Sequence, residues 1–299
     1  MRWEMLAEVM DSTTNGRTSR PSEWNAGWTA PVSRLRQRYQ QSAYWLSIGR
    51  DCVRGRASGS VYVLGYVKSG TTWLCYLLSS VLGIPLLETP KQSWPRRRGP
   101  CVFHVHRFIP LRSVRERTVY VLRDGRDAIV SFYFHIVREW EQPIKRRMER
   151  RLGREMTAEN IRENLPQFID FMQGNRTHSI DYRAHVEEWR RRQEVYVALR
   201  YEDLLKETVA ELSRVVFEVT GREPSAELVR AAVAKHDFTR LTGRQRGVHD
   251  PSSFLRKGVE GDWRNHFSPE AARLYDAYAG DLLIELGYET SRSWVSAIT

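Results

Sequence analysis

The chain has 299 residues, of which 41% are hydrophobic and 28% charged. This composition is typical of globular proteins and excludes a largely disordered chain or a membrane protein. The length allows one large core or two modest ones. The formal charge of +11 indicates an anionic partner or a basic surface. Because the excess is mostly arginine, scattered over the whole chain, charge alone does not separate a nucleic-acid binder from an enzyme with an anionic substrate.

The compartment is predicted from the N-terminus and the cysteines. The first 14 residues carry acids and no long apolar run, and no later stretch approaches the roughly 20 apolar residues of a membrane span. Cys52, Cys75 and Cys101 have no metal-like spacing, and the last two lie in apolar runs, as reduced core thiols do. We therefore predict a cytoplasmic protein with no membrane partner.

The chain divides into a lead-in, one domain and a tail. Residues 1–57 are predicted to pack on the domain, which spans 58–290, and 291–299 form the tail. Short β-branched runs predict strands at 61–65, 101–106, 118–122 and 195–199. Apolar residues at helical spacing predict helices at 70–82, 128–140, 182–189, 204–219, 228–233 and 271–286. This alternation predicts an α/β fold, with a central parallel sheet flanked by helices and ligands at the carboxyl ends of the strands.

The first predicted strand leads into the segment Gly65–Trp73, which has the Gly-x-x-x-x-Gly spacing of a phosphate-binding loop. Backbone N–H groups at a helix N-terminus bind phosphate oxygens. The lysine, however, lies inside the loop as Lys68, and no obvious carboxylate ends a later strand to hold Mg²⁺. These departures favour a nucleotide 5′-phosphate over a Mg-triphosphate. A P-loop kinase or NTPase is the alternative, and it predicts binding of Mg-ATP.

The segment Tyr66-Val-Lys-Ser-Gly-Thr-Thr-Trp73 resembles the Tyr-Pro-Lys-Ser-Gly-Thr-Thr-Trp signature of cytosolic sulfotransferases, with Val67 in place of proline. The resemblance implies a P-loop nucleotide-kinase-like fold. It also implies 3′-phosphoadenosine 5′-phosphosulfate (PAPS) as co-substrate, 3′-phosphoadenosine 5′-phosphate (PAP) as product, and no metal. Lys68 would be catalytic, at the oxygen between phosphate and sulfuryl group, where a cation lowers the barrier. The 5′-phosphate would be held by Ser69, Gly70, Thr71 and Thr72. Trp73 would stack on the adenine.

Two further segments resemble the same family. Arg123 precedes Ser131 by eight positions, as in the family's 3′-phosphate loop, and arginine binds phosphate with two parallel hydrogen bonds. Phe254–Trp263 matches the family's Arg-Lys-Gly-x-x-Gly-Asp-Trp pattern. The residues implied to close on the 3′-phosphate are Arg256, Lys257 and Gly258. Tyr201 and Phe238 correspond to adenine contacts, although both are equally compatible with a core position.

Sulfuryl transfer to a hydroxyl requires a proton acceptor, and histidine suits neutral pH. The family's Lys-Thr-His pattern corresponds here to His104-Val-His106. We predict His106 as the catalytic base. His104, at the family's lysine position, assists only when protonated or binds the acceptor. Two histidines at this spacing on a strand point the same way, so a metal pair is the alternative, although no third ligand has suitable spacing.

The acceptor side is less defined. Residues of about 140–180 are expected to form a variable helical segment over the acceptor, and 145–154 carries a basic stripe. The stripe is either a solvated helix face or a patch for an acidic substrate. The family's dimer motif is mostly missing from Arg264 onward, so we expect a monomer or weak homodimer. The partner is a small-molecule acceptor rather than nucleic acid, since a non-catalytic nucleic-acid binder gives no reason for two nucleotide-loop signatures.

Overall fold

The computed structural model describes residues 46, 48–49, 53, 59–87, 99–109, 116–138, 142–173, 181–193 and 196–299. The predicted lead-in over 1–57 lies outside these residues except for four positions, and so do 140–141 and 174–180 of the predicted segment 140–180. No helix in the described ranges is long and apolar enough to cross a membrane.

The described strands form one parallel sheet, as predicted. They are β1 Val61–Gly65, β2 Leu86–Leu87, β3 Val102–Val105, β4 Thr118–Leu122 and β5 Val197–Arg200. Their order is β2-β3-β1-β4-β5, and every neighbouring pair is parallel. Strand β2 was not predicted, because two residues carry no readable periodicity.

The described helices follow the predicted positions, with additions. They are α3 Thr71–Leu82, α5 Gly125–Val137, α6 Gln142–Leu152, α7 Ile161–Gln173, α8 Tyr182–Arg190, α9 Tyr201–Lys206, α10 Thr208–Thr220, α11 Ala226–Lys235, α12 Phe238–Thr242 and α13 Pro269–Glu285, with 3-10 turns η3 Asp262–Asn265 and η4 Arg292–Val295. The single helix predicted at 204–219 is two helices, α9 and α10. They separate at Glu207, whose φ of −122° and ψ of 50° are not helical.

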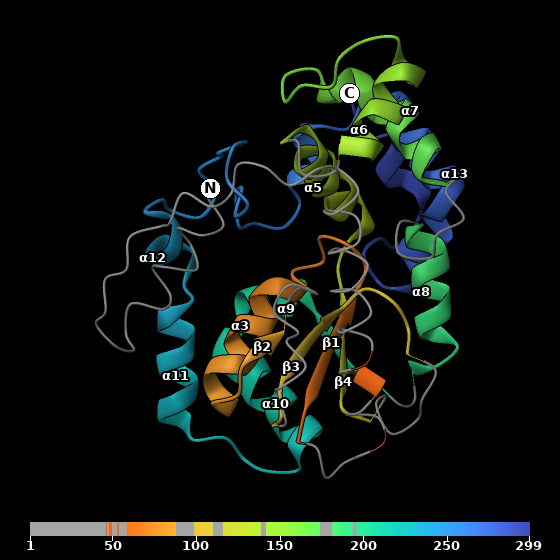
Figure 1. Cartoon of the computed structure of the whole chain (residues 1–299). Helices are drawn as coiled ribbons and strands as arrows, with labels where there is room; N and C mark the ends of the chain where they lie inside the picture. Colours follow the sequence, from red (N-terminus) through yellow and green to blue (C-terminus); the bar gives the residue numbers. More distant parts are fainter. Residues whose placement is uncertain are drawn as a thin grey trace.

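Helices cover both faces of the sheet (Figure 1). Val61 and Val63 of β1 pack with α3 and α10 on one face, whereas Tyr62 and Leu64 pack with α5, α8 and α13 on the other. The alternation of side chains along a strand therefore divides the core into two layers. Both faces are buried, which explains why the strands read as continuous apolar runs.

The carboxyl edge of the sheet has a topological switch point between β1 and β4. From β1 the chain runs through α3 to β2 on one side, and β4 is paired with β5 on the other. Ligands of open α/β sheets bind at such a point. Gly65, at the end of β1, pairs with Val121 of β4, so the loops that begin at Tyr66 and Arg123 emerge side by side.

Candidate functional site

The loop between β1 and α3 presents backbone donors to a ligand. Lys68 has a φ of 66°, a conformation that no other non-glycine residue of the described ranges adopts. The Ser69 N–H donates to the Tyr66 carbonyl at 3.1 Å, and Gly70 enters α3 in the left-handed region. No side chain caps this helix N-terminus. Its first N–H groups are therefore available to an anion.

Lys68 lies among other cations. Its Nζ is 4.0 Å from the centre of the Phe254 ring, and its backbone carbonyl accepts a hydrogen bond from Arg123 Nη1 at 2.9 Å. Burial, and then the charges of Arg138, Arg123 and Arg256 in that order of effect, together lower the pKa of Lys68 to about 7. Like charges gathered in a buried place destabilise one another until an anion arrives. The cluster is therefore suited to a highly charged anion.

The loop that begins at Arg123 and the loop that contains Arg256 meet. Arg123 Nη2 donates to the Val259 carbonyl at 3.4 Å, while its Nη1 holds the Lys68 carbonyl. Arg256 lies over the Phe134 ring at 4.5 Å and pairs with Asp262 at 2.6 Å. Lys257 also pairs with Asp262, at 2.5 Å. Three segments distant in sequence thus converge at the switch point.

Buried polar atoms in this convergence lack a partner among the described residues. They are Ser69 Oγ, Arg123 Nε and Arg256 Nη1. Buried donors without a partner are rare in folded proteins, because each costs about 1–3 kcal/mol. All three belong to residues predicted to bind phosphate. The residues present therefore fit a bound phosphate-bearing group.

The predicted adenine contacts line one side of the cluster. The Trp73 and Tyr201 rings meet edge to face at 6.3 Å, and the Arg123 guanidinium lies 4.3 Å from the Tyr201 ring. Tyr201 packs so closely on Gly70 that a Cβ there would overlap its ring. Phe238 packs on Gly258, which has a φ of 66° and would place a Cβ 2.7 Å from the ring. Both glycines thus allow an aromatic ring to approach the backbone of a phosphate loop.

His106 is oriented for proton transfer. Its Nδ1 lies 2.9 Å from the Gly65 carbonyl oxygen. A carbonyl oxygen only accepts, so Nδ1 carries the proton and Nε2 of the neutral ring keeps its lone pair. Burial and the charge of Lys68 lower the pKa of His106, although the hydrogen bond to Gly65 opposes them. His106 is thus neutral, as a general base must be.

His104 is engaged elsewhere. Its Nε2 lies 2.7 Å from Thr71 Oγ1, and its ring centre is 4.6 Å from that of His106. Burial, then His106 and Lys68, hold the pKa of His104 well below its usual range. His104 is therefore a neutral ring that orients Thr71, which is not the role of the permanent cation in the family pattern. No group of three or more metal-ligating side chains occurs within the described ranges.

Two residues near the site were not singled out from the sequence. His135 lies four residues after Ser131 in α5, and Arg138, three residues further, caps the C-terminus of that helix; all three are half-buried, and their spacing places them on one face. Burial lowers the pKa of His135 to about 3, with contributions from Lys68, Arg138 and His106. Helical spacing counted from Ser131 is the signal that would have found His135 and Arg138.

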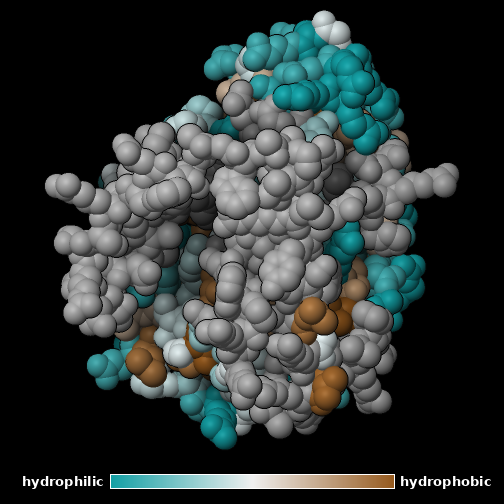
Figure 2. Space-filling model, in the orientation of Figure 1, coloured by the Kyte–Doolittle hydropathy of each residue, from teal (hydrophilic) through white to brown (hydrophobic). Residues whose placement is uncertain are grey.

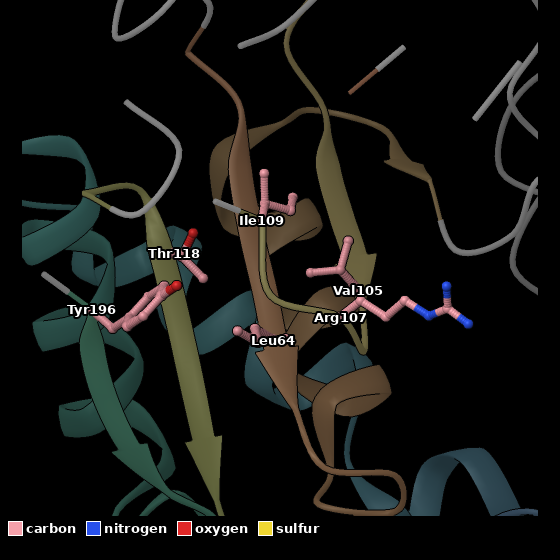
Figure 3. Close-up of a pocket in the computed structure, with 6 residues that line it drawn as sticks. All are labelled: Leu64, Val105, Arg107, Ile109, Thr118 and Tyr196. Atoms are coloured by element: carbon pink, nitrogen blue, oxygen red, sulfur yellow. The ribbon is translucent and has the colours of Figure 1, made fainter. Parts of the chain in front are cut away.

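A small, mostly apolar pocket lies on the opposite face of the sheet from His104 (Figure 3). Leu64, Val105, Ile109 and Tyr196 contribute to its lining, whereas the Arg107 side chain extends away from the others. Alternation along β1 and β3 places Leu64 and Val105 away from the face of His104. The pocket therefore lies on the other face of the sheet from His104.

Residues 96–287 match the model of a family described as the sulfotransferase domain. The matched range includes Arg123, Ser131 and Arg256 and begins after the loop at Gly65–Trp73. Parallel pairing of β1 with β3 and β4 joins that loop to the matched range.

Individual relatives agree with the family match. A 3-alpha-hydroxysteroid sulfotransferase of Cavia porcellus is 26% identical over 249 residues, which cover 71% of this chain and 79% of that protein. A flavonol 3-sulfotransferase of Flaveria bidentis is also 26% identical, over 72% of this chain and 79% of its own length. The crystal structure of mouse sulfotransferase SULT7A1 complexed with PAP has a TM-score of 0.54 at 18% identity, and covers 74% of this chain and 84% of that one. The structural likeness supports the fold.

Proposed function

The chain belongs to the sulfotransferase domain family, and from that premise we propose how its residues transfer a sulfuryl group from PAPS to a small-molecule acceptor. The proposal rests on one observation. Three segments place the cations Lys68, Arg123 and Arg256 and three partnerless polar atoms around one position, beside a histidine with a free Nε2. Although Arg256 pairs with Asp262, the polar atoms Ser69 Oγ, Arg123 Nε and Arg256 Nη1 have no partner among the described residues, whereas a surface ion-pair network would satisfy its donors internally.

The phosphates of the donor are divided between two sets of residues. Ser69, Thr71, Thr72 and the first N–H groups of α3 would hold the 5′-phosphate, as helix N-termini do. Arg123, Ser131 and the Arg256–Gly258 segment would hold the 3′-phosphate. Lys257 donates to Asp262 and must turn from it to contribute. Trp73, Tyr201 and Phe238 would contact the adenine.

PAPS supplies the sulfuryl group, and its remainder leaves as PAP. Lys68 stabilises the negative charge that builds on the phosphate oxygen as the bond to sulfur breaks. His106 Nε2 accepts the proton of the acceptor hydroxyl or amine, whose atom forms the new bond to sulfur. His106 Nδ1–H remains on the Gly65 carbonyl, which keeps Nε2 directed at the acceptor. His104 orients the Thr71 hydroxyl.

We further propose that the protein acts in the cytoplasm as a monomer or weak homodimer. Cys75 and Cys101 are buried and form no disulfide within the described residues, consistent with a reducing compartment. Residues expected to carry the family's dimer motif are used within the chain, since His266 pairs with Asp262 at 3.2 Å and Ser268 caps α13. Small hydroxyl compounds are the first acceptors to test, because steroid and flavonol sulfotransferases are among the relatives.

The direct experiment is transfer of label from PAPS carrying ³⁵S to a panel of phenols, alcohols and amines. We expect His106→Gln to lower kcat by about 10²–10⁴-fold, the usual contribution of a general base. The variant keeps a side-chain donor for the Gly65 carbonyl. Transfer by His106→Gln at the parent rate, with any acceptor of the panel, would remove His106 from the mechanism.

Calorimetry separates this function from the two alternatives. We expect tight binding of PAP without Mg²⁺ and weak binding of ATP with or without it, because Thr71 and Thr72 stand where a P-loop kinase has lysine and serine or threonine. Tighter binding of Mg-ATP than of PAP would favour a kinase. Salt-steep binding to nucleic acid without any PAP affinity would favour the nucleic-acid binder.

A further inference from the structure

The last twelve residues of the chain, 288–299, lie beyond the range that matches the family model. Two of their side chains contact Arg126 in a single turn, Asp124–Arg126, which directly follows Arg123, and a third reaches this turn through Glu202. The direct contacts are made by Glu289 and Trp294, and the indirect one by Tyr288. We call residues 288–299 the C-terminal clasp.

Arg126 is the centre of these contacts. Its side chain is 1% exposed and pairs with Asp124 at 2.7 Å and Glu289 at 2.5 Å. Its guanidinium lies between two indoles, 3.9 Å from the Trp263 ring and 4.7 Å from the Trp294 ring. A buried arginine with two carboxylates and two aromatic faces has little freedom to move. The clasp therefore holds the Asp124–Arg126 turn in place.

A second contact reaches the same turn through Glu202. Tyr288 Oη donates to Glu202 Oε2 at 3.2 Å, and Glu202 Oε1 accepts from the backbone N–H of Asp124 at 3.0 Å. The turn is thus held by its side chain at Arg126 and by its backbone at Asp124. Arg123 immediately precedes it in the chain.

The clasp also reaches the segment of Arg256. The Trp294 and Trp263 rings meet edge to face at 5.5 Å. Asp127 accepts hydrogen bonds from the N–H groups of Gly261 at 2.6 Å and Trp263 at 2.9 Å. Asp262, between them, holds Arg256 and Lys257. The turns behind Arg123 and Arg256 are therefore fastened to each other and to the same tryptophan of the clasp.

We propose that the C-terminal clasp is a positioning element for recognition of the donor's 3′-phosphate: Trp294 and Glu289 hold Arg126 and Trp263, and these hold the two loops that carry Arg123 and Arg256. The proposal rests on the assignment of those two arginines to the 3′-phosphate under the proposed function. The loop for the 5′-phosphate belongs to β1 and α3, which none of these clasp side chains contacts. The clasp is linked to that loop through Arg123, which donates to the Lys68 carbonyl, and should therefore affect recognition of the 3′-phosphate much more than that of the 5′-phosphate.

The test compares PAP with adenosine 5′-phosphate, which lacks the 3′-phosphate, by calorimetry on the full chain. We expect Trp294→Ala to weaken binding of PAP by about tenfold, or about 1.4 kcal/mol. Affinity for adenosine 5′-phosphate should stay within about twofold, as should kcat and the KM for the acceptor. Trp294→Phe keeps an aromatic face for Arg126 and should restore most of the PAP affinity.

Arg292→Ala is the matched control. It removes an exposed ion pair with Asp276, at 2.7 Å, from the same turn η4 without touching Arg126. Glu289→Gln is nearly isosteric and tests the clasp even where Trp294→Ala does not fold. If Trp294→Ala weakens binding of both nucleotides equally, or leaves binding of both unchanged, the proposed role of the clasp is wrong. A wild-type protein that binds PAP no better than adenosine 5′-phosphate instead overturns the 3′-phosphate assignment itself.

Discussion

Two parts of the molecule are rich in basic side chains and differ in what surrounds them. Helix α6 carries most of the basic stripe predicted at 145–154, and the end of the molecule where α6 and α7 lie is mostly hydrophilic in Figure 2. Here the cations have acidic partners. Arg151 pairs with Asp170, Arg154 with Glu163 at 3.0 Å, and Lys145 with Glu149 at 3.7 Å. These contacts favour the solvated-face interpretation of the stripe.

At the carboxyl edge of the sheet the cations face one another. Arg123 and Arg256 are each only 9% exposed, and the charges of both lower the pKa of Lys68. Acids are present, but Asp127 accepts backbone N–H groups and Asp262 supports its own loop. The comparison shows that the number of arginines does not identify an anion site. Burial combined with missing partners identifies such a site, because uncompensated charge in a poorly solvated place is unstable without a ligand.

The largest expected difference between the regions is in catalysis. Lys68→Met keeps the length of the side chain and removes the charge at the breaking bond, so we expect kcat/KM to fall by about 10²–10³-fold. Arg150→Met removes a cation from the exposed face of α6 and should change kcat/KM by less than about twofold. Both are measured by transfer from labelled PAPS. An equal loss of kcat/KM in the two variants would contradict the inference that the buried cations, and not those of α6, act in catalysis.

A smaller difference is expected in donor binding. Arg256→Met removes a charge-assisted hydrogen bond to the 3′-phosphate, so the Kd for PAP should rise by about 10–100-fold. Arg151→Met, in the basic stripe, should leave it unchanged. Calorimetry at a single ionic strength gives both values. PAP binding unaffected by Arg256→Met would place the 3′-phosphate elsewhere.

The two regions should also differ in how they affect the pH dependence of PAP binding. The free protein holds the pKa of Lys68 near 7, and a bound anion favours the charged ammonium and raises it. The complex therefore binds more protons than the free protein, and PAP affinity should fall as pH rises above about 7, by at most tenfold per pH unit. Arg138→Gln removes the strongest of the neighbouring charges, so the fall should begin at higher pH. Binding measured from pH 6 to 9 tests this, with Arg150→Gln as the unshifted control.

The smallest effect is expected for the stripe itself. Arg151→Ala breaks an exposed ion pair with Asp170, and such pairs contribute about 0–1 kcal/mol. We expect a loss of less than about 1 kcal/mol in the free energy of unfolding by urea, and a smaller loss at 1 M salt because exposed charges are screened. A loss above 2 kcal/mol would show that the pair is structural.

Much of the fold could be predicted from local sequence, because the patterns that indicate strands and helices are short-range. The runs at 61–65 and 118–122 coincide with β1 and β4, and the predicted face of Tyr182, His185, Val186 and Trp189 is the buried face of α8. The break at Glu207 had no such signal, since apolar spacing continues across it. Gly70 and Gly258 of the motifs indicated the site for a steric reason, because only glycine fits beneath the rings of Tyr201 and Phe238.

The sequence by itself therefore determined which segments we predict to bind the donor, because the lysine, arginines and glycines of each segment lie within a few neighbouring residues and keep a recognisable spacing. Only the tertiary structure decided which side chains lie close together. His135 and Arg138 join Lys68 from another element, His104 is bound to Thr71, and Trp294 reaches Arg126. Such relations depend on through-space distance and burial, which set both the pKa of a buried cation and the freedom of a loop.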